Sequence, residues 1–173
     1  AMRTVPRERF VAKSLVEFAY EDAPLAIEEG QTISQPYIVA AMIEASEVRP
    51  GDCVLEVGAG SGYAAAVLGQ VAKHVYAIER HETLAASARR RLADLSYDNV
   101  EIIVGDGTRG LPDHAPFDAI LVTASGPAVP EALKEQLAIG GRLVIPVGEE
   151  FSQSLCKVIR RTQTSYEEAD LGA

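Results

Sequence analysis

The sequence is poor in cysteine and contains no long hydrophobic run. Its two cysteines, Cys53 and Cys156, are too few for a disulfide framework or a zinc site. The longest apolar runs fall far short of the roughly 18 residues that a membrane-spanning helix needs. Residues 1–4 do not resemble the start of a signal peptide. We therefore expect a cytoplasmic protein with no membrane partner and no metal.

Positive charge is also scarce. The chain has 16 lysines and arginines against 25 aspartates and glutamates, which gives a formal net charge of −9. A nucleic-acid-binding surface requires a basic face, so no nucleic-acid partner is expected. The one dense basic cluster, residues 89–91, lies in an amphipathic helical pattern and is typical of a solvated helix face.

Short β-branched runs alternate with helical runs from residue 50 onward. Strands are predicted at 53–58, 74–79, 100–106, 117–124, 142–147, 154–162 and 165–171, and helices at 63–72, 82–95 and 130–137. Near-continuous apolar strands that alternate with helices indicate a mostly parallel sheet covered on both faces. The chain therefore belongs to the doubly wound, Rossmann-like α/β class, whose ligands bind beyond the carboxyl ends of the strands.

The first 49 residues have a different character. Pro6 and Pro24 interrupt them, and a strong helical pattern is found only at 34–48. We expect residues 1–49 to form a small helical cap near the carboxyl edge of a sheet built by residues 50–173. The length of 173 residues fits one domain.

Three glycines follow the first predicted strand of the sheet. Gly58, Gly60 and Gly62 have the spacing G-x-G-x-G, which differs from the G-x-G-x-x-G of dinucleotide-binding proteins. Glycine allows a positive φ and a close approach of ligand to backbone. A tight strand-to-helix turn alone would explain one of these glycines, but not easily three.

Three acidic residues lie at or near the ends of the first three predicted strands: Glu56, Glu79 and Asp106. In a parallel sheet they share one edge, where an acid after the second strand suits a ribose diol and another can accept from an adenine amino group. Clustered carboxylates would repel a pyrophosphate but attract the sulfonium and ammonium groups of S-adenosylmethionine. The pattern therefore favours S-adenosylmethionine over NAD. Each acid alone is equally typical of a solvated strand end, and an NAD-dependent oxidoreductase stays open as an alternative.

The segment GQTISQP, residues 30–36, precedes the helical pattern of the cap. Ser34 has two explanations. It can be the N-cap of a helix over 35–47 with Pro36 in the first turn, or it can present its hydroxyl beside a helix terminus that attracts an anion. Local sequence alone favours the cap. Thr32 can bind cofactor or substrate, or only its own loop.

Several segments together resemble the protein-L-isoaspartate O-methyltransferases. They are VPRERFV, AYEDAPLAI, GQTISQPYIVA, VLEVGAGSGYAAAVL, VYAIER, NVEIIVGDGTRGLPDHAPFDAILVTAS and GGRLVIPVG. The resemblance extends from residue 3 to about 160. Its most specific part is QTISQP, which general methyltransferases lack.

The resemblance implies an activity and a set of site residues. The family transfers a methyl group from S-adenosylmethionine to the α-carboxylate of an L-isoaspartyl residue in damaged protein, and the ester closes to a succinimide that returns some normal aspartate. By resemblance, Ser34 is the active-site serine and Thr32 belongs to the same segment. The cofactor-binding residues implied are Glu56, Gly58, Gly60, Gly62, Glu79 for the ribose, and Asp106 and Gly107 for the adenine.

Methyl transfer to a carboxylate needs positioning more than it needs a base. The nucleophile is already ionised at neutral pH. We therefore interpret His74, His81 and His114 as structural or surface residues. We interpret Ser34 as a residue that orients the carboxylate and not as a covalent nucleophile.

Family members usually have a longer N-terminal lead and continue beyond the last residue of this sequence into a strand near the substrate site. We therefore expect a domain that is truncated at both ends. Two further alternatives follow: a related methyltransferase acting on another peptide carboxylate such as aspartate, or a cofactor-binding domain without activity in a larger protein. The partners implied are isoaspartyl-containing peptides and proteins, and a monomer is the default because nothing in the sequence specifies an oligomer.

Overall fold

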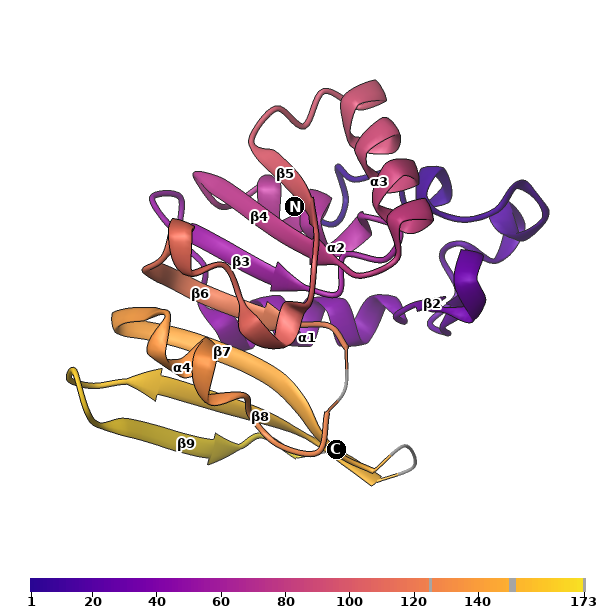
Figure 1. Cartoon of the computed structure of the whole chain (residues 1–173). Coiled ribbons are helices and arrows are strands. Elements are labelled where there is room, and N and C mark those ends of the chain that lie inside the picture. The colour runs from indigo at the N-terminus through magenta and orange to yellow at the C-terminus, as the bar shows by residue number, and fades with distance from the viewer. Residues whose placement is uncertain (125, 150–151, 173) are drawn as a thin grey trace.

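The fold is built on a seven-stranded sheet, seen in a computed structural model that describes residues 1–124, 126–149 and 152–172. The strand order is β5-β4-β3-β6-β7-β8-β9 (Figure 1). The strands are β3 (Cys53–Val57), β4 (His74–Glu79), β5 (Val100–Val104), β6 (Phe117–Val122), β7 (Leu137–Glu149), β8 (Ser152–Arg160) and β9 (Tyr166–Asp170). All seven predicted strands are present, β4 with its predicted bounds and the others with shifted ends.

The sheet is parallel from β5 to β7 and antiparallel from β7 to β9. Parallel neighbours need a crossover of a dozen or more residues, and residues 161–165 between β8 and β9 are too few for one. The mostly parallel, doubly wound sheet predicted from the sequence is confirmed.

Strand β7 begins earlier than predicted. The strand was predicted at 142–147, but β7 also includes Gly140 and Gly141, which precede that range. The register along β6 changes there, from Phe117 opposite Leu137 to Ala119 opposite Arg142. The glycines therefore form an irregularity within the strand. The helix predicted at 130–137 is shorter than expected and forms α4 (Glu131–Glu135).

Both faces of the sheet are buried along its central strands β3, β4 and β6, as their apolar sequences predicted, whereas β9 at the edge is mostly exposed. Helices α1 (Pro36–Ser46), α2 (Tyr63–Gly69) and α3 (Glu82–Asp94) share a core with Val54 and Val144. On the opposite face, Leu55 and Leu143 pack with Leu133 of α4. Neighbouring residues of one strand thus enter different cores, and each fully buried leucine or valine contributes roughly 1.5–3 kcal/mol.

The N-terminal cap contains short elements before α1. They are the 3₁₀ helices η1 (Arg7–Phe10), η2 (Lys13–Phe18) and η3 (Glu28–Gly30) and the two-residue strands β1 (Leu25–Ala26) and β2 (Thr32–Ile33). Strands β1 and β2 pair with each other and not with the main sheet. Figure 1 shows β2 beyond the arrowhead of β3, so this part of the cap lies at the carboxyl end of that strand, whereas α1 packs on the face of the sheet.

Three observations bear on compartment and metals. Cys53 and Cys156 are both free thiols. Across the described ranges, none of the helices has the length and apolar character that crossing a membrane requires. The same residues contain no cluster of three or more histidine, cysteine or acidic side chains arranged to hold a metal ion.

Candidate active site

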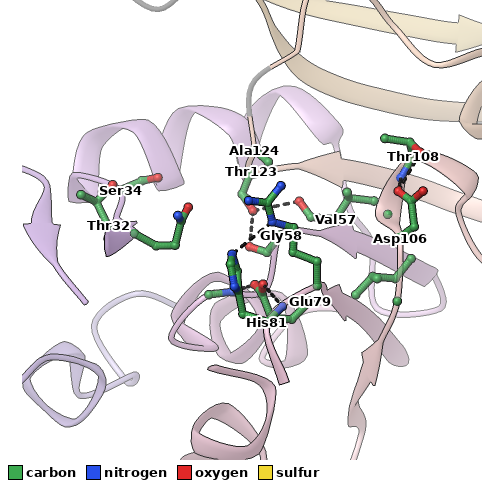
Figure 2. Close-up of a pocket in the computed structure, with 16 residues that line it drawn as sticks. Thr32, Ser34, Val57, Gly58, Glu79, His81, Asp106, Thr108, Thr123 and Ala124 are labelled. Atoms are coloured by element: carbon green, nitrogen blue, oxygen red, sulfur yellow. Dashed lines mark hydrogen bonds between the residues drawn. The ribbon is translucent and has the colours of Figure 1, made fainter. Parts of the chain in front are cut away.

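A cavity of about 520 Å³ lies at the carboxyl ends of β3, β4, β5 and β6 (Figure 2). The cap closes one side of it. Seven residues singled out from the sequence line this cavity: Thr32, Ser34, Gly58, Gly60, Glu79, Asp106 and Gly107. Residues from the cap and from three strand ends, up to 75 positions apart (107 − 32), are thus brought into one site.

Glu79 ends β4 with its side chain almost fully buried. One carboxylate oxygen accepts from the backbone N–H of Gly60 at 2.9 Å, and the other accepts from the N–H of His81 at 2.9 Å. These bonds fix the carboxylate between the glycine loop and the start of α3 (Figure 2). Each oxygen keeps a second lone pair, so the group is suited to accept from the two hydroxyls of a ribose.

The glycine loop leaves β3 in a left-handed conformation. Gly58 has φ +97°, and a Cβ built on it would lie 3.0 Å from Thr123 Oγ1. Gly62 has φ +88° and lies against α3, where a Cβ would come 3.2 Å from that of Ala88. Gly62 is not among the residues that line the cavity, so it shapes the loop and does not face a ligand there.

We expect Gly58→Ala to weaken cofactor binding about tenfold and to destabilise the fold by about 1–3 kcal/mol. The added methyl group meets Thr123 and Ala124 on a backbone that favours glycine. Calorimetric titration with S-adenosylhomocysteine and thermal unfolding measure both effects. Gly51→Ala is the matched control, because nothing lies within 4 Å of a Cβ there. Equal affinities of the two variants would contradict the close fit at Gly58.

Asp106 and Gly107 follow β5 and line the cavity, and Figure 2 shows Asp106 at the end opposite Thr32 and Ser34. Asp106 Oδ1 accepts from the N–H and the hydroxyl of Thr108, at 3.0 and 2.7 Å. These bonds hold the pKa of the Asp106 carboxyl below its usual value. At Gly107 a Cβ would overlap Cγ1 of Val57, so glycine keeps this wall open.

Glu56 is buried more deeply than the edge predicted from the sequence. It precedes the last residue of β3, is 1% exposed, and lines a small adjoining cavity of about 50 Å³. Neither carboxyl oxygen has a hydrogen-bond partner among the described residues, and the Thr123 hydroxyl donates to the carbonyls of Val57 and Gly58. Burial, with the charge of Glu79, raises the pKa of Glu56 well above its ordinary value.

We expect the cofactor-free protein to lose stability through Glu56 as the pH rises. A carboxyl whose pKa is raised in the folded state stabilises the fold below its unfolded pKa, and that contribution is lost as the pH rises through the folded pKa. The slope reaches at most about 1.4 kcal/mol per pH unit. Chemical denaturation between pH 5 and 8 should give a flatter dependence for Glu56→Gln than for wild type.

The control for this experiment is Glu101→Gln, which changes an exposed glutamate of β5. It should reproduce the pH dependence of the wild type. Parallel curves for wild type and Glu56→Gln would show that Glu56 is charged in the folded protein at every pH tested.

The structure corrects the N-cap interpretation of Ser34. Helix α1 begins at Pro36 and its N-cap is Gln35, which forms no side-chain capping bond. Pro36 has no N–H, and the N–H of Tyr37 donates to Asp22 at 2.9 Å. The first two positions of the helix therefore offer no free N–H group to an anion. The interpretation of Ser34 as an orienting residue thus depends on its hydroxyl.

Ser34 and Thr123 stand where three cavities meet. Both line the large cavity, the small cavity beside Glu56, and a third cavity of about 320 Å³. The third cavity is mainly apolar, with walls from α1, β7 and β8. Its other lining residues are Ile38, Ala41, Met42, Pro146, Gln153, Ser154, Leu155 and Gly172. A polar, acidic space thus joins an apolar one beside two hydroxyl groups.

Two residues of the site were not assigned from the sequence. Thr123 ends up at the junction because it follows β6, although a strand-end threonine is usually unremarkable. The interpretation of His81 as structural or surface was incomplete, because His81 lines the large cavity beside Glu79. By contrast, the rings of His74 and His114 both contact the ring of Tyr76 in tilted arrangements, at 4.4 and 4.3 Å between ring centroids.

The polar groups that line the large cavity and the small cavity beside it fit S-adenosylmethionine. The carboxylate of Glu79 has free lone pairs, and the unpartnered Glu56 carboxyl lies in the adjoining space. Arg80 is exposed at the cavity rim, and the described residues that line the small cavity beside Glu56 include no arginine or lysine. A cationic sulfonium suits this environment, whereas a diphosphate would face carboxylates.

The sheet order, the glycine loop after β3, the acid that ends β4 and the acid that follows β5 define a Rossmann-like, S-adenosylmethionine-dependent methyltransferase. The family model described as "Protein-L-isoaspartate(D-aspartate) O-methyltransferase (PCMT)" matches residues 1–172. The chain belongs to this family, so the alternative of an NAD-dependent oxidoreductase is wrong.

The similar proteins agree in sequence and in structure. Protein-L-isoaspartate O-methyltransferase 2 of Pelobacter propionicus is 58% identical over 172 residues, which are 99% of this chain and 76% of that protein. A solved protein-L-isoaspartate O-methyltransferase matches with a TM-score of 0.81 and 35% identity. That match covers 90% of this chain, and the chain spans about half (52%) of the solved one.

A second solved structure contains a ligand. It is a protein-L-isoaspartate O-methyltransferase (beta-aspartate methyltransferase) of Plasmodium falciparum in complex with S-adenosyl-L-homocysteine. The TM-score is 0.84 at 26% identity, over 99% of this chain and 84% of that one. The ligand named there is what S-adenosylmethionine becomes when it has given up its methyl group.

Proposed function

We propose that this protein methylates the α-carboxylate of L-isoaspartyl residues in damaged proteins and thereby starts their repair. The observation that carries the proposal is the position of Ser34. It belongs to the GQTISQP segment and stands where the acidic cavity meets the apolar one. The family to which the chain belongs has this activity in its name.

The proposed cofactor site uses the residues of the large and small cavities. Glu79 accepts from the ribose hydroxyls, Asp106 and Gly107 contact the adenine, and Gly58 and Gly60 let the ligand approach the loop. Glu56 faces the cationic part, and Thr32 closes the site from the cap. Gly62 supports the loop from behind. When bound, S-adenosylmethionine supplies an electrophilic methyl group.

The proposed acceptor site is the apolar cavity, with Ser34 at its inner end. A substrate carboxylate is ionised at neutral pH, so the site needs a residue that orients it and not one that deprotonates it. The Ser34 hydroxyl donates to one carboxylate oxygen. Ile38, Met42 and Leu155 exclude water from the reacting groups.

The test compares two peptides that differ only in one linkage. Each is incubated with the protein and with methyl-labelled S-adenosylmethionine, one containing an isoaspartyl and one an aspartyl residue at the same position. We expect a base-labile label on the isoaspartyl peptide alone. Labelling of the aspartyl peptide would favour the related carboxyl methyltransferase, and cofactor binding without any labelling would favour an inactive binding domain.

We further propose that the chain is one methyltransferase domain, acts as a monomer in the cytoplasm, and has no nucleic-acid partner. The net charge of −9 and the two free thiols support these points. Light scattering during gel filtration tests the monomer. An excess of RNA should leave methylation of the peptide unchanged. Competition by RNA would contradict the proposal that the protein has no nucleic-acid partner.

A further inference from the structure

Arg7 is a buried cation that joins three parts of the protein. It lies in η1 and is 1% exposed. Its Nε donates to the carbonyl of Ala19 at 2.7 Å, and its Nη2 donates to the carbonyl of Ser34 at 2.8 Å. The guanidinium carbon lies 4.8 Å from the centroid of the Tyr63 ring. One side chain thus contacts the residue that follows η2, the Ser34 segment and the start of α2.

A buried guanidinium is costly unless its bonds are good. Burial lowers the pKa of Arg7, and its Nη1 has no hydrogen-bond partner among the described residues. The two carbonyl bonds are charge-assisted, and the ring of Tyr63 offers a favourable face to the cation. The planar fork reaches both carbonyls at once, which a single ammonium group on a flexible stem does not reproduce.

Ser34 lies outside the helices and strands of the described residues. It follows β2, a two-residue strand that pairs only with β1, and it precedes the N-cap of α1. Tyr63, on the other side of Arg7, comes directly after Gly62 and lines the small cavity beside Glu56. Arg7 therefore links the acceptor-side hydroxyl to the helix that begins at the glycine loop.

We propose that Arg7 is a positioning residue for methyl transfer. It holds the backbone of Ser34 at a fixed distance from the glycine loop, so that the hydroxyl stays at the junction of the cavities. The inference rests on the role proposed for Ser34. A displacement of a reacting group by about 1 Å can cost on the order of 10²-fold in rate, so the loss of this link should act mainly on turnover.

The test measures kcat and KM for an isoaspartyl peptide, the Kd of S-adenosylhomocysteine and thermal unfolding. Arg7→Met should lower kcat between about ten- and a hundredfold while Kd changes less than about threefold. Arg7→Lys should recover only part of the loss. Arg9→Met is the matched control, because Arg9 lies in the same short helix and is exposed. It should match the wild type.

A double-mutant cycle separates positioning from general stability. If Arg7 acts through Ser34, then Arg7→Met combined with Ser34→Ala should have nearly the kcat of Ser34→Ala alone. If the double variant instead shows the product of the two separate losses in kcat, the proposal is overturned. An unchanged kcat in Arg7→Met would also overturn it. If Arg7→Met does not fold, the cycle is run with Arg7→Lys and judged by the same criterion.

The outcomes distinguish this inference from the proposed function. A wild-type protein that leaves the isoaspartyl peptide unlabelled refutes the function and the inference with it. A wild-type protein that labels the peptide, with an impaired Ser34→Ala and an unimpaired Arg7→Met, refutes only the inference.

Discussion

Ser34→Ala should lower kcat for an isoaspartyl peptide by about 10²-fold and leave the Kd of S-adenosylhomocysteine within about twofold. The Ser34 side chain lies at the junction of the acidic and apolar cavities, and the ribose and adenine contacts are assigned to residues further along the large cavity. The variant loses a hydroxyl that orients the acceptor and keeps the residues that bind the donor. Steady-state kinetics and calorimetric titration measure the two quantities separately.

The control for Ser34→Ala is Ser14→Ala in η2, which removes an exposed hydroxyl from the same N-terminal segment. It should behave as wild type in both measurements. Unchanged turnover in Ser34→Ala would exclude the orienting role. A large loss of cofactor affinity with little effect on kcat would place Ser34 on the donor side of the site.

Glu79→Ala should weaken the binding of S-adenosylhomocysteine by about 10²-fold or more. The carboxylate holds the amides of Gly60 and His81, and its remaining lone pairs are available to a ribose. Each hydrogen bond to a charged group is worth roughly 1.5–3 kcal/mol, and the variant leaves both amides without their acceptor. Calorimetric titration gives the affinity, and thermal unfolding gives the loss of stability.

Glu79→Gln is a sharper form of this experiment because it keeps the size of the side chain. Both carboxylate oxygens accept from backbone N–H groups, so an amide must direct its NH₂ group at one of these donors. We expect Glu79→Gln to show most of the affinity loss of Glu79→Ala. Glu82→Gln, at the first turn of α3, is the control and should bind as wild type. A Glu79→Gln variant of wild-type affinity would contradict the assignment of the ribose to Glu79.

Local periodicity was enough to predict the sheet. Apolar runs placed the five parallel strands β3 to β7, because a strand buried on both faces has to be apolar at consecutive positions, as Val54 and Leu55 are. Glu79 and Asp106 were placed at the site for a related reason. Parallel strands bring their carboxyl ends to one edge whatever the length of the connections between them.

Details that depend on three-dimensional neighbours were not predictable. Ser34 resembles an N-cap in sequence, but the chain enters α1 one residue later, at Gln35, and Asp22 occupies the amide of Tyr37. Gly140 and Gly141 resemble a turn, but their register change is fixed by pairing with β6. No local pattern connects these residues to their partners, which are close in space but lie in other segments of the sequence.

Arg7 and Glu56 show the same limit for buried charge. Arginine in a proline-flanked segment normally indicates a surface residue, yet Arg7 is buried because carbonyl groups of Ala19 and Ser34 meet around it. Glu56 was expected at an acidic rim beside Glu79. It lies below that rim, since it comes before the end of β3 and points to the face covered by the helices.

A crystal structure with S-adenosylhomocysteine and an isoaspartyl peptide bound together is the most direct test of the proposed site. We expect the ribose on Glu79, the adenine beside Asp106, and the isoaspartyl carboxylate within hydrogen-bond distance of the Ser34 hydroxyl. A peptide bound away from the apolar cavity, or a cofactor whose ribose lies away from Glu79, would contradict the arrangement proposed for donor and acceptor.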